Sequence, residues 1–141
     1  MKWVCGLIII SMILIAGCGS SIYEPKADIS IEPAKITLKS GETSEPITVS
    51  ITKKDKGSTP TAFEITLETP NPDMLQFKRD NTTITSIQTG ILKRKGDRLS
   101  DVFTILATKA EGSDNTAFTA TLNLIYNNTI VDSKDIKVTV K

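Results

Sequence analysis

From residue 28 to the end of the chain, apolar and polar side chains alternate in short runs, which is the pattern of half-buried β-strands. The clearest run covers residues 116–126. Its inward face is expected to carry Phe118, Ala120, Leu122, Leu124 and Tyr126. Asn127 and Asn128 follow and predict a two-residue turn, because Asn tolerates a positive φ better than most residues. The chain then returns as a second strand, so the two runs predict a β-hairpin.

The return strand carries one irregularity. Ile136, Val138 and Val140 form an inward face, but Asp132 and Lys134 fall on the same parity. Because charged side chains are rarely placed in a core, we expect a bulge or a strand break near residues 132–135.

Shorter alternating runs fill the rest of this region, separated by Gly, Pro, Asn and Asp. They lie at 29–31, 36–38, 47–51, 63–67, 75–77, 84–87 and 103–107, and Pro33 splits the first strand in two. No stretch shows a 3.6-residue period with helix caps. Seven or eight short strands with turn signals between them predict an all-β fold, a single antiparallel β-sandwich.

A different pattern opens the chain, where Lys2 precedes an apolar run from Val4 to Ile15. A membrane-spanning helix needs about 20 apolar residues, so this shorter run is typical of a cleaved, helical signal peptide. The residues Ile15-Ala16-Gly17-Cys18 at its end resemble the lipobox of bacterial-type lipoproteins, in which an aliphatic and two small residues precede a lipidated cysteine. An ordinary cleaved signal peptide is the alternative, and it would leave a secreted protein with one free thiol.

The lipobox resemblance implies three parts: a lipoprotein signal peptide over 1–17, the lipidated Cys18 with a flexible tether over 18–27, and a β-sandwich domain over 28–141. A diacylglyceryl group on Cys18 supplies two acyl chains, and two chains hold a protein stably at a membrane where one holds it marginally. The expected location is the extracytoplasmic face of a prokaryotic cell membrane, anchored through lipid.

Two similar corners occur within the sandwich region. Leu38-Lys-Ser-Gly41-Glu42 leads after four residues into the strand at Ile47, and Leu92-Lys-Arg-Lys-Gly96-Asp97 leads after four residues into Val102 and Phe103. We interpret them as two equivalent corners of one sandwich. The first corner and the alternating strand behind it resemble the opening of the immunoglobulin-like modules of bacterial and archaeal surface proteins. The resemblance implies that fold, with mostly adhesive, spacing or accessory roles, although the paired cysteines and core tryptophan of true immunoglobulin domains are missing.

The composition of the chain excludes several kinds of partner and catalytic site. Without Lys2 the chain carries 16 basic and 16 acidic side chains, and such a neutral balance argues against nucleic acid as a partner. The sequence has no histidine, and Cys5 is lost with the signal peptide, which excludes Ser-His-Asp, Cys-His and ordinary zinc sites. Glu64 and Glu68 are a conceivable carboxylate pair, but they alternate with apolar residues and should lie on a solvent face. We expect no enzyme activity and no cofactor.

Two surface features remain open to interpretation. Lys93-Arg94-Lys95 with Arg98 could contact anionic lipid head groups or an acidic wall polymer, and the alternative is a solvated turn beside Asp97 and Asp101. Calcium could use Asp73 with Asp80, or Glu111 with Asp114, but no spaced Asp-x-Asp pattern occurs, so no metal is expected.

Asn81-Thr82-Thr83 and Asn127-Asn128-Thr129 match the acceptor pattern for N-glycosylation. Modification requires a host with the machinery, and otherwise Asn81 and Asn127 are plain turn residues.

These observations favour a non-catalytic binding or accessory module of an envelope assembly, with an envelope protein as its partner. Contact would run through loops at the distal end or through an exposed edge strand. A solute- or glycan-binding lipoprotein is the second hypothesis, which the scarcity of aromatic residues disfavours. An inhibitor of exported hydrolases is the third, with Thr69-Pro70-Asn71-Pro72-Asp73-Met74 as the candidate loop.

Overall fold

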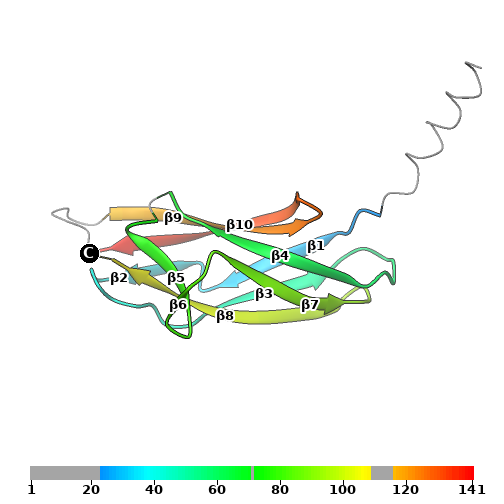
Figure 1. Ribbon diagram of the computed structural model, residues 1–141, viewed down its shortest axis with the longest axis horizontal. Helices are drawn as coiled ribbons and strands as arrows, with labels where there is room; N and C mark the ends of the chain where they lie inside the picture. The colour runs from blue at the N-terminus through cyan, green and yellow to red at the C-terminus, as the bar shows by residue number, and fades with distance from the viewer. Residues whose placement is uncertain (1–22, 71, 109–115) are drawn as a thin grey trace, which may run out of the picture.

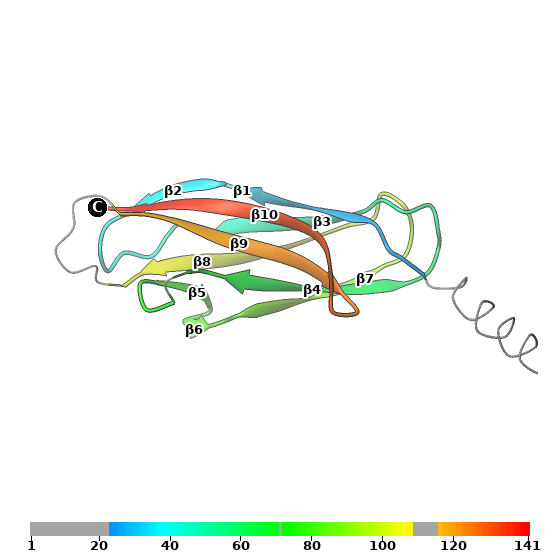
Figure 2. The same cartoon turned by 90° about the horizontal axis from the view of Figure 1, so that it is seen from above.

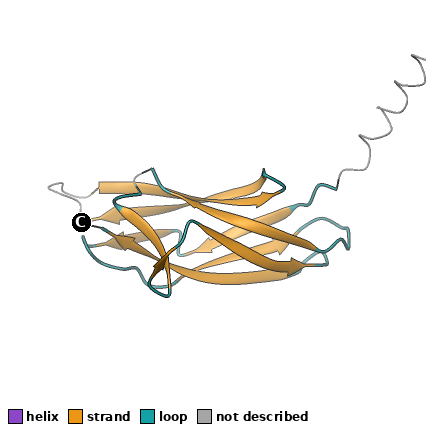
Figure 3. Ribbon diagram, in the orientation of Figure 1, coloured by secondary structure: helices purple, strands orange, loops and turns teal. Residues whose placement is uncertain are grey.

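The computed structural model describes residues 23–70, 72–108 and 116–141, and Figures 1 and 3 show that part of the chain as strands joined by loops. It contains ten strands: β1 (Ala27–Glu32), β2 (Lys35–Leu38), β3 (Ile47–Lys53), β4 (Thr61–Glu68), β5 (Leu75–Arg79), β6 (Thr82–Thr83), β7 (Ser86–Leu92), β8 (Arg98–Ala107), β9 (Thr116–Tyr126) and β10 (Thr129–Val140). No helix among these residues is long and apolar enough to cross a membrane.

The strands form two five-stranded sheets that pack face to face, as Figure 2 shows from above. One sheet has the order β1-β3-β8-β5-β6 and the other β2-β10-β9-β4-β7. The predicted all-β sandwich is confirmed, with two differences. The strands number ten rather than seven or eight, and β2 pairs with β10 in parallel while the other pairs are antiparallel.

Both differences have a local cause. Pro33 has no N–H to continue a ladder, and the predicted break there lets the chain change sheets. β1 therefore pairs with β3 in one sheet, while β2 pairs with β10 in the other, and the Glu32–Pro33 peptide between them is cis. The two-residue β6 adds another strand, because Asp80 and Asn81 turn the chain back with φ of 49° and 65°.

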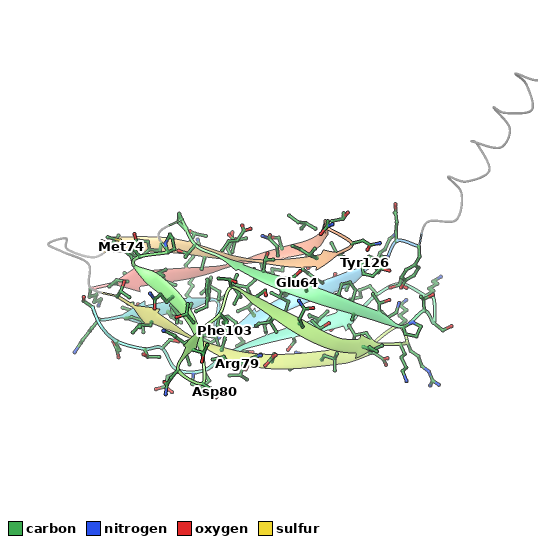
Figure 4. The ribbon with its side chains drawn as sticks, viewed as in Figure 1. Glu64, Met74, Arg79, Asp80, Phe103 and Tyr126 are labelled. Carbon is green, nitrogen blue, oxygen red and sulfur yellow. The ribbon has the colours of Figure 1, made fainter. Side chains whose placement is uncertain are left out.

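The core lies between the sheets and consists of the apolar residues at the alternate positions that the sequence predicts to face inward. The two edge-to-face rings of Phe77 and Phe103, with centroids 5.8 Å apart, pack in it. Figure 4 labels Phe103 there, and Arg79, at the end of β5, makes an ion pair with Asp101 of β8. One residue on the outer face of β9, Asn123, is also buried, at 7% exposure, because β9 lies between β10 and β4. Ser133 Oγ donates a hydrogen bond to Asn123 Oδ1 at 2.8 Å.

The predicted irregularity in the return strand occurs slightly earlier, as a register shift between Ile130 and Asp132. The side chain of Asp132 then bridges the sheets, because its Oδ2 accepts the backbone N–H of Ile29 in β1 at 2.9 Å. The inward carboxylate is thus satisfied by a backbone donor of an edge strand.

The two predicted corners are equivalent in their hydrogen bonds. Gly41 N–H donates to the oxygen of Ala107 at the end of β8, and Gly96 N–H donates to the oxygen of Lys53 at the end of β3. Glu42 and Asp97, which follow the two glycines, each accept the N–H of that same strand end at their backbone oxygens. Because β3 and β8 are antiparallel neighbours, the corners lie at opposite ends of one strand pair.

Candidate functional site at the tether end

The end of the sandwich where the described chain begins, which we name the tether end, gathers three segments. They are residues 23–28, the β3–β4 loop (54–60) and the β7–β8 turn (93–97), and the C-terminus lies at the other end (Figure 1). Lys54 N–H donates to the oxygen of Lys26 at 2.7 Å. The bonds of the Gly96 corner to Lys53 join the third segment to the same place.

Tyr23 is fastened to the domain by its hydroxyl group. The hydroxyl donates to Asp55 Oδ2 at 2.8 Å, accepts from Lys53 Nζ at 2.9 Å, and lies 3.0 Å from Thr61 Oγ1. Lys53 Nζ also forms an ion pair with Asp55, and the Lys53 side chain has no exposed surface. We name these four residues the Tyr23 clamp.

The clamp sets the charges of its two ionic members. Burial alone would lower the pKa of Lys53, but the hydrogen bonds and charge attraction of Asp55 and Tyr23 outweigh it, so the pKa lies above its usual value. Burial would likewise raise the pKa of Asp55, but donation from Lys53, Tyr23 and the backbone of Lys26 holds that pKa below its usual value. The pair is therefore ionised throughout the neutral range.

The ring of Tyr23 also contacts an aromatic residue of the sandwich. It meets Tyr126 edge-to-face with ring centroids 6.1 Å apart, and Tyr126 meets Phe63 with centroids 6.0 Å apart. Lys53 Nζ lies 5.6 Å from the centroid of the Tyr23 ring. A residue of the predicted tether is therefore held by hydrogen bonds and by a row of aromatic rings.

A groove of about 600 Å³ runs beside the clamp, between residues 23–28 and the β9–β10 hairpin. Tyr23, Tyr126, Ile130 and Val131 supply apolar surface, and Glu24, Lys26, Asp28 and Lys54 supply charges. Ile130 is 58% exposed. The groove could take a small amphipathic group, but only two aromatic rings line it.

The predicted basic cluster lies at the tether end. Lys93, Arg94 and Lys95 are exposed in the β7–β8 turn, and Arg98 is exposed at the start of β8. Asp97 shapes the turn, because its Oδ2 accepts the N–H groups of Arg94 at 2.8 Å and Lys93 at 2.9 Å. These bonds lower the pKa of Asp97.

The other predicted residues are dispersed. Asn81 and Asn127 are exposed in tight turns, where their use as glycosylation sites stays a prediction. Asp73 precedes β5 and Asp80 follows it, and no group of three metal-ligating side chains occurs among the described residues. Glu64 and Glu68 stand on one strand about 13 Å apart. Cys18, residue 71 of the candidate inhibitor loop, and the pair Glu111 and Asp114 lie outside the described residues.

The clamp is the part of the site that the sequence analysis missed. Lys53 is not among the expected site residues, yet it is the last residue of β3. The signal was its position, because Lys53 continues the inward parity of Ile47, Val49 and Ile51. A lysine at an inward position requires a buried partner.

The chain matches no protein-family model, and no curated protein matches it. Solved structures do resemble it. The Escherichia coli chaperone DraB is 13% identical, with a TM-score of 0.51 over 80% of this chain and 54% of that chain. Native alpha-2-macroglobulin from Escherichia coli, from domain MG7 to the C-terminus, is 16% identical, with a TM-score of 0.51 over 87% of this chain and 17% of that chain.

This chain thus spans about half the length of DraB and a small part of the macroglobulin structure. At such identities the likeness concerns the fold alone. Together with the two packed sheets, it defines the described part of the chain as an immunoglobulin-like β-sandwich domain.

Proposed function

We propose that the protein is a membrane-anchored surface lipoprotein whose β-sandwich acts as a non-catalytic binding or accessory module of an envelope assembly. The attachment of Tyr23, five positions after Cys18, carries this proposal. It supports the proposal because Tyr23 is held at one end of the sandwich, which leaves the sheet edges and the far end available to a partner.

The non-catalytic role is supported by the chemistry of the chain. The sequence has no histidine, and residues 19–141 contain no cysteine. Lys53 and Asp55 form the most buried ion pair among the described residues, and both are already bonded within the clamp. What this surface offers a partner is therefore shape, charge and backbone hydrogen bonding.

The β7 edge is the best candidate for protein contact. Among the residues that the structure describes, β7 pairs only with β4, runs for seven residues and carries Ile91, which is 61% exposed. The other sheet edges are blunted, as natural edges usually are. β6 has two residues, β2 has four, and β1 carries Asp28 and Glu32 and has its Ile29 N–H occupied by Asp132. An extended partner segment would pair with β7 by strand addition.

A first experiment tests anchor and partner together. Tagged protein is crosslinked in native host membranes and purified, and its partners are identified by mass spectrometry. A metabolic fatty-acid label reports acylation, with Cys18→Ser as the matched control. Label on the wild-type protein alone, with one near-stoichiometric protein partner that Cys18→Ser loses, supports the proposal. Absence of label overturns the anchor, and absence of a specific protein overturns the accessory role.

The groove beside Tyr126 favours a second candidate, the binding of a small solute or glycan. It predicts that a soluble ligand shifts the fluorescence of Tyr23 and Tyr126, and that Tyr126→Ala abolishes the shift. Recovery of polysaccharide instead of protein in the crosslinking experiment would favour this candidate.

A further inference from the structure

We propose that the tether end carries a cationic surface that lies on anionic phospholipid head groups and so fixes the orientation of the anchored domain. The inference rests on the proposed lipid anchor and adds to it a contact between the folded domain and the membrane. We name this surface the basic end. Its exposed members are Lys26, Lys54, Lys56, Lys93, Arg94, Lys95 and Arg98.

The basic end is assembled from segments distant in sequence. Lys26 belongs to the entry segment, Lys54 and Lys56 to the β3–β4 loop, and the remaining four residues to the β7–β8 turn and the start of β8. Backbone hydrogen bonds from Lys54 to Lys26 and from Gly96 to Lys53 hold the three segments together. The positive charges are therefore brought to one end by the fold.

The acidic residues of the tether end neutralise only part of this charge. Asp55 is occupied by Lys53 and Tyr23, and Asp97 by the backbone of its own turn. Asp28 Oδ2 lies 3.5 Å from Lys54 Nζ. Glu24 is the fourth acidic residue of the tether end. With Lys53, the tether end holds half of the basic residues that follow Cys18 but only a quarter of the acidic ones. Since the whole is neutral, the remainder of the domain is net negative.

The short chain between Cys18 and Tyr23 limits how far the tether end can lie from the membrane. Residues 19–22 alone separate Cys18 from Tyr23, and five Cα–Cα steps reach at most about 18 Å when fully extended. Because the clamp holds Tyr23 on the domain, a lipidated Cys18 keeps the tether end within that distance of the head groups. Screening at physiological salt acts over about 8 Å, so small movements of the domain bring the basic end into the range of attraction.

The positive charge of the basic end and the short chain between Cys18 and Tyr23 together identify anionic phospholipid as the binding partner. A membrane surface that contains anionic lipid attracts clustered Lys and Arg side chains. The net negative remainder of the domain is repelled by the same surface. The domain therefore lies with its basic end down and its C-terminal end away from the bilayer, which leaves the β7 edge accessible from the side.

The test uses the lipidated protein reconstituted into vesicles of phosphatidylcholine alone, or of phosphatidylcholine and phosphatidylglycerol in about equal parts. Acetylation of individual lysines is followed by mass spectrometry. We expect several-fold slower labelling of Lys54 and Lys56 in the phosphatidylglycerol vesicles, with no change at Lys39 and Lys141. About 0.5 M salt should abolish the difference, since it screens exposed charges.

The variant Lys93→Gln/Arg94→Gln/Lys95→Gln should remove the protection of Lys54 and Lys56. The matched control Lys35→Gln/Lys39→Gln/Lys134→Gln removes the same charge from positions outside the tether end and should keep it. Equal labelling in both kinds of vesicle, or equal loss in both variants, would overturn the proposal.

Failure of the anchor gives a different result. Protein that leaves phosphatidylcholine vesicles at high salt is not held by lipid, which contradicts the proposed function. The unanchored protein can then be floated with phosphatidylglycerol vesicles, where each neutralised basic residue should lower the affinity about fivefold. No binding to those vesicles overturns the basic end as a lipid surface.

Discussion

The ammonium group of Lys53 has no exposed surface, and it is paired with the carboxylate of Asp55 only two residues further along the chain. β3 ends at Lys53, and the chain then turns so that Asp55 faces back toward it. Tyr23, from the other side of the cluster, bonds to both members. A charge in this position is tolerated only because its partners replace the lost water.

The first prediction concerns this pair. Asp55→Asn leaves a buried ammonium without its counter-charge and should lower the free energy of unfolding by about 3–5 kcal/mol. Lys53→Met/Asp55→Asn removes both charges while Met keeps most of the volume, so its loss should be clearly smaller. Urea unfolding followed by far-ultraviolet circular dichroism measures both. A double variant as unstable as Asp55→Asn would contradict the role of charge pairing.

The second prediction concerns pH. The pKa of Asp55 is lower in the folded state than in the unfolded state, so its contribution to stability is full above about pH 4 and is lost as the pH falls through the folded value. The pKa of Lys53 is raised, so its contribution is full below about pH 10 and is lost as the pH rises through the folded value.

We therefore expect a stability plateau across neutral pH with losses at both extremes. Urea midpoints measured from pH 3 to pH 11 report it. The Lys53→Met/Asp55→Asn variant should lose less stability at both extremes than the wild type. Asp28→Asn is the control, because it removes a carboxylate from an exposed ion pair and should leave the profile unchanged. Identical profiles for wild type and double variant would refute the assignment.

The third prediction separates the hydroxyl of Tyr23 from its ring. Tyr23→Phe keeps the contact with Tyr126 but removes the group that bonds to Lys53 and Asp55, so it should cost about 1–3 kcal/mol. Tyr126→Phe deletes the hydroxyl of the neighbouring ring and should cost less than 0.5 kcal/mol, roughly the range of a change away from such networks. Denaturant unfolding compares the two, and equal losses would mean that the clamp acts by packing alone.

Much of the fold follows from alternation in the sequence. Ile47, Val49 and Ile51 are buried as their parity predicts, and the Asn127-Asn128 turn has the positive φ values, 49° and 60°, that a two-residue hairpin needs. What alternation cannot supply is the pairing of distant strands. Asp132 was recognised as an exception to the inward face, but its acceptor role toward Ile29 depends on how the two sheets are stacked.

The site was less predictable than the fold for the same reason. The sequence itself contains the basic run Lys93-Arg94-Lys95. That Lys26 and Lys54 lie close to this run follows only from the fold, which brings the three segments to one end of the sandwich. Tyr23 falls within the predicted tether, because no local sequence pattern indicates its hydrogen bonds to Asp55 and Thr61, which lie 32 and 38 residues away.

The fourth prediction tests the equivalence of the two corners. Gly41 and Gly96 have φ of 84° and 91°, and a Cβ at either would meet no atom within 4 Å, so only backbone strain opposes a side chain. Gly41→Ala and Gly96→Ala should each lower the free energy of unfolding by about 1–2 kcal/mol, and by similar amounts. Denaturant unfolding of the two variants checks this, and a difference above about 1 kcal/mol, the width of the expected range, would show that the corners are not equivalent.

The fifth prediction concerns the β7 edge. Ile91 is 61% exposed on a strand that pairs on one side only, so Ile91→Lys places a charge where a partner strand would add and should abolish partner crosslinking. Because the side chain is already in solvent, the free energy of unfolding should change by less than about 0.5 kcal/mol.

Val102→Lys is the matched control for that experiment. Val102 is also an exposed β-branched residue, at 46%, but it lies on β8, an inner strand of the other sheet between β3 and β5. Crosslinking yield from native membranes, normalised to protein level, should fall for Ile91→Lys and persist for Val102→Lys. If both variants keep the partner, the contact lies elsewhere, and the loops at the C-terminal end become the surface to mutate. If only Val102→Lys loses it, the outer face of the β8 sheet is the binding surface.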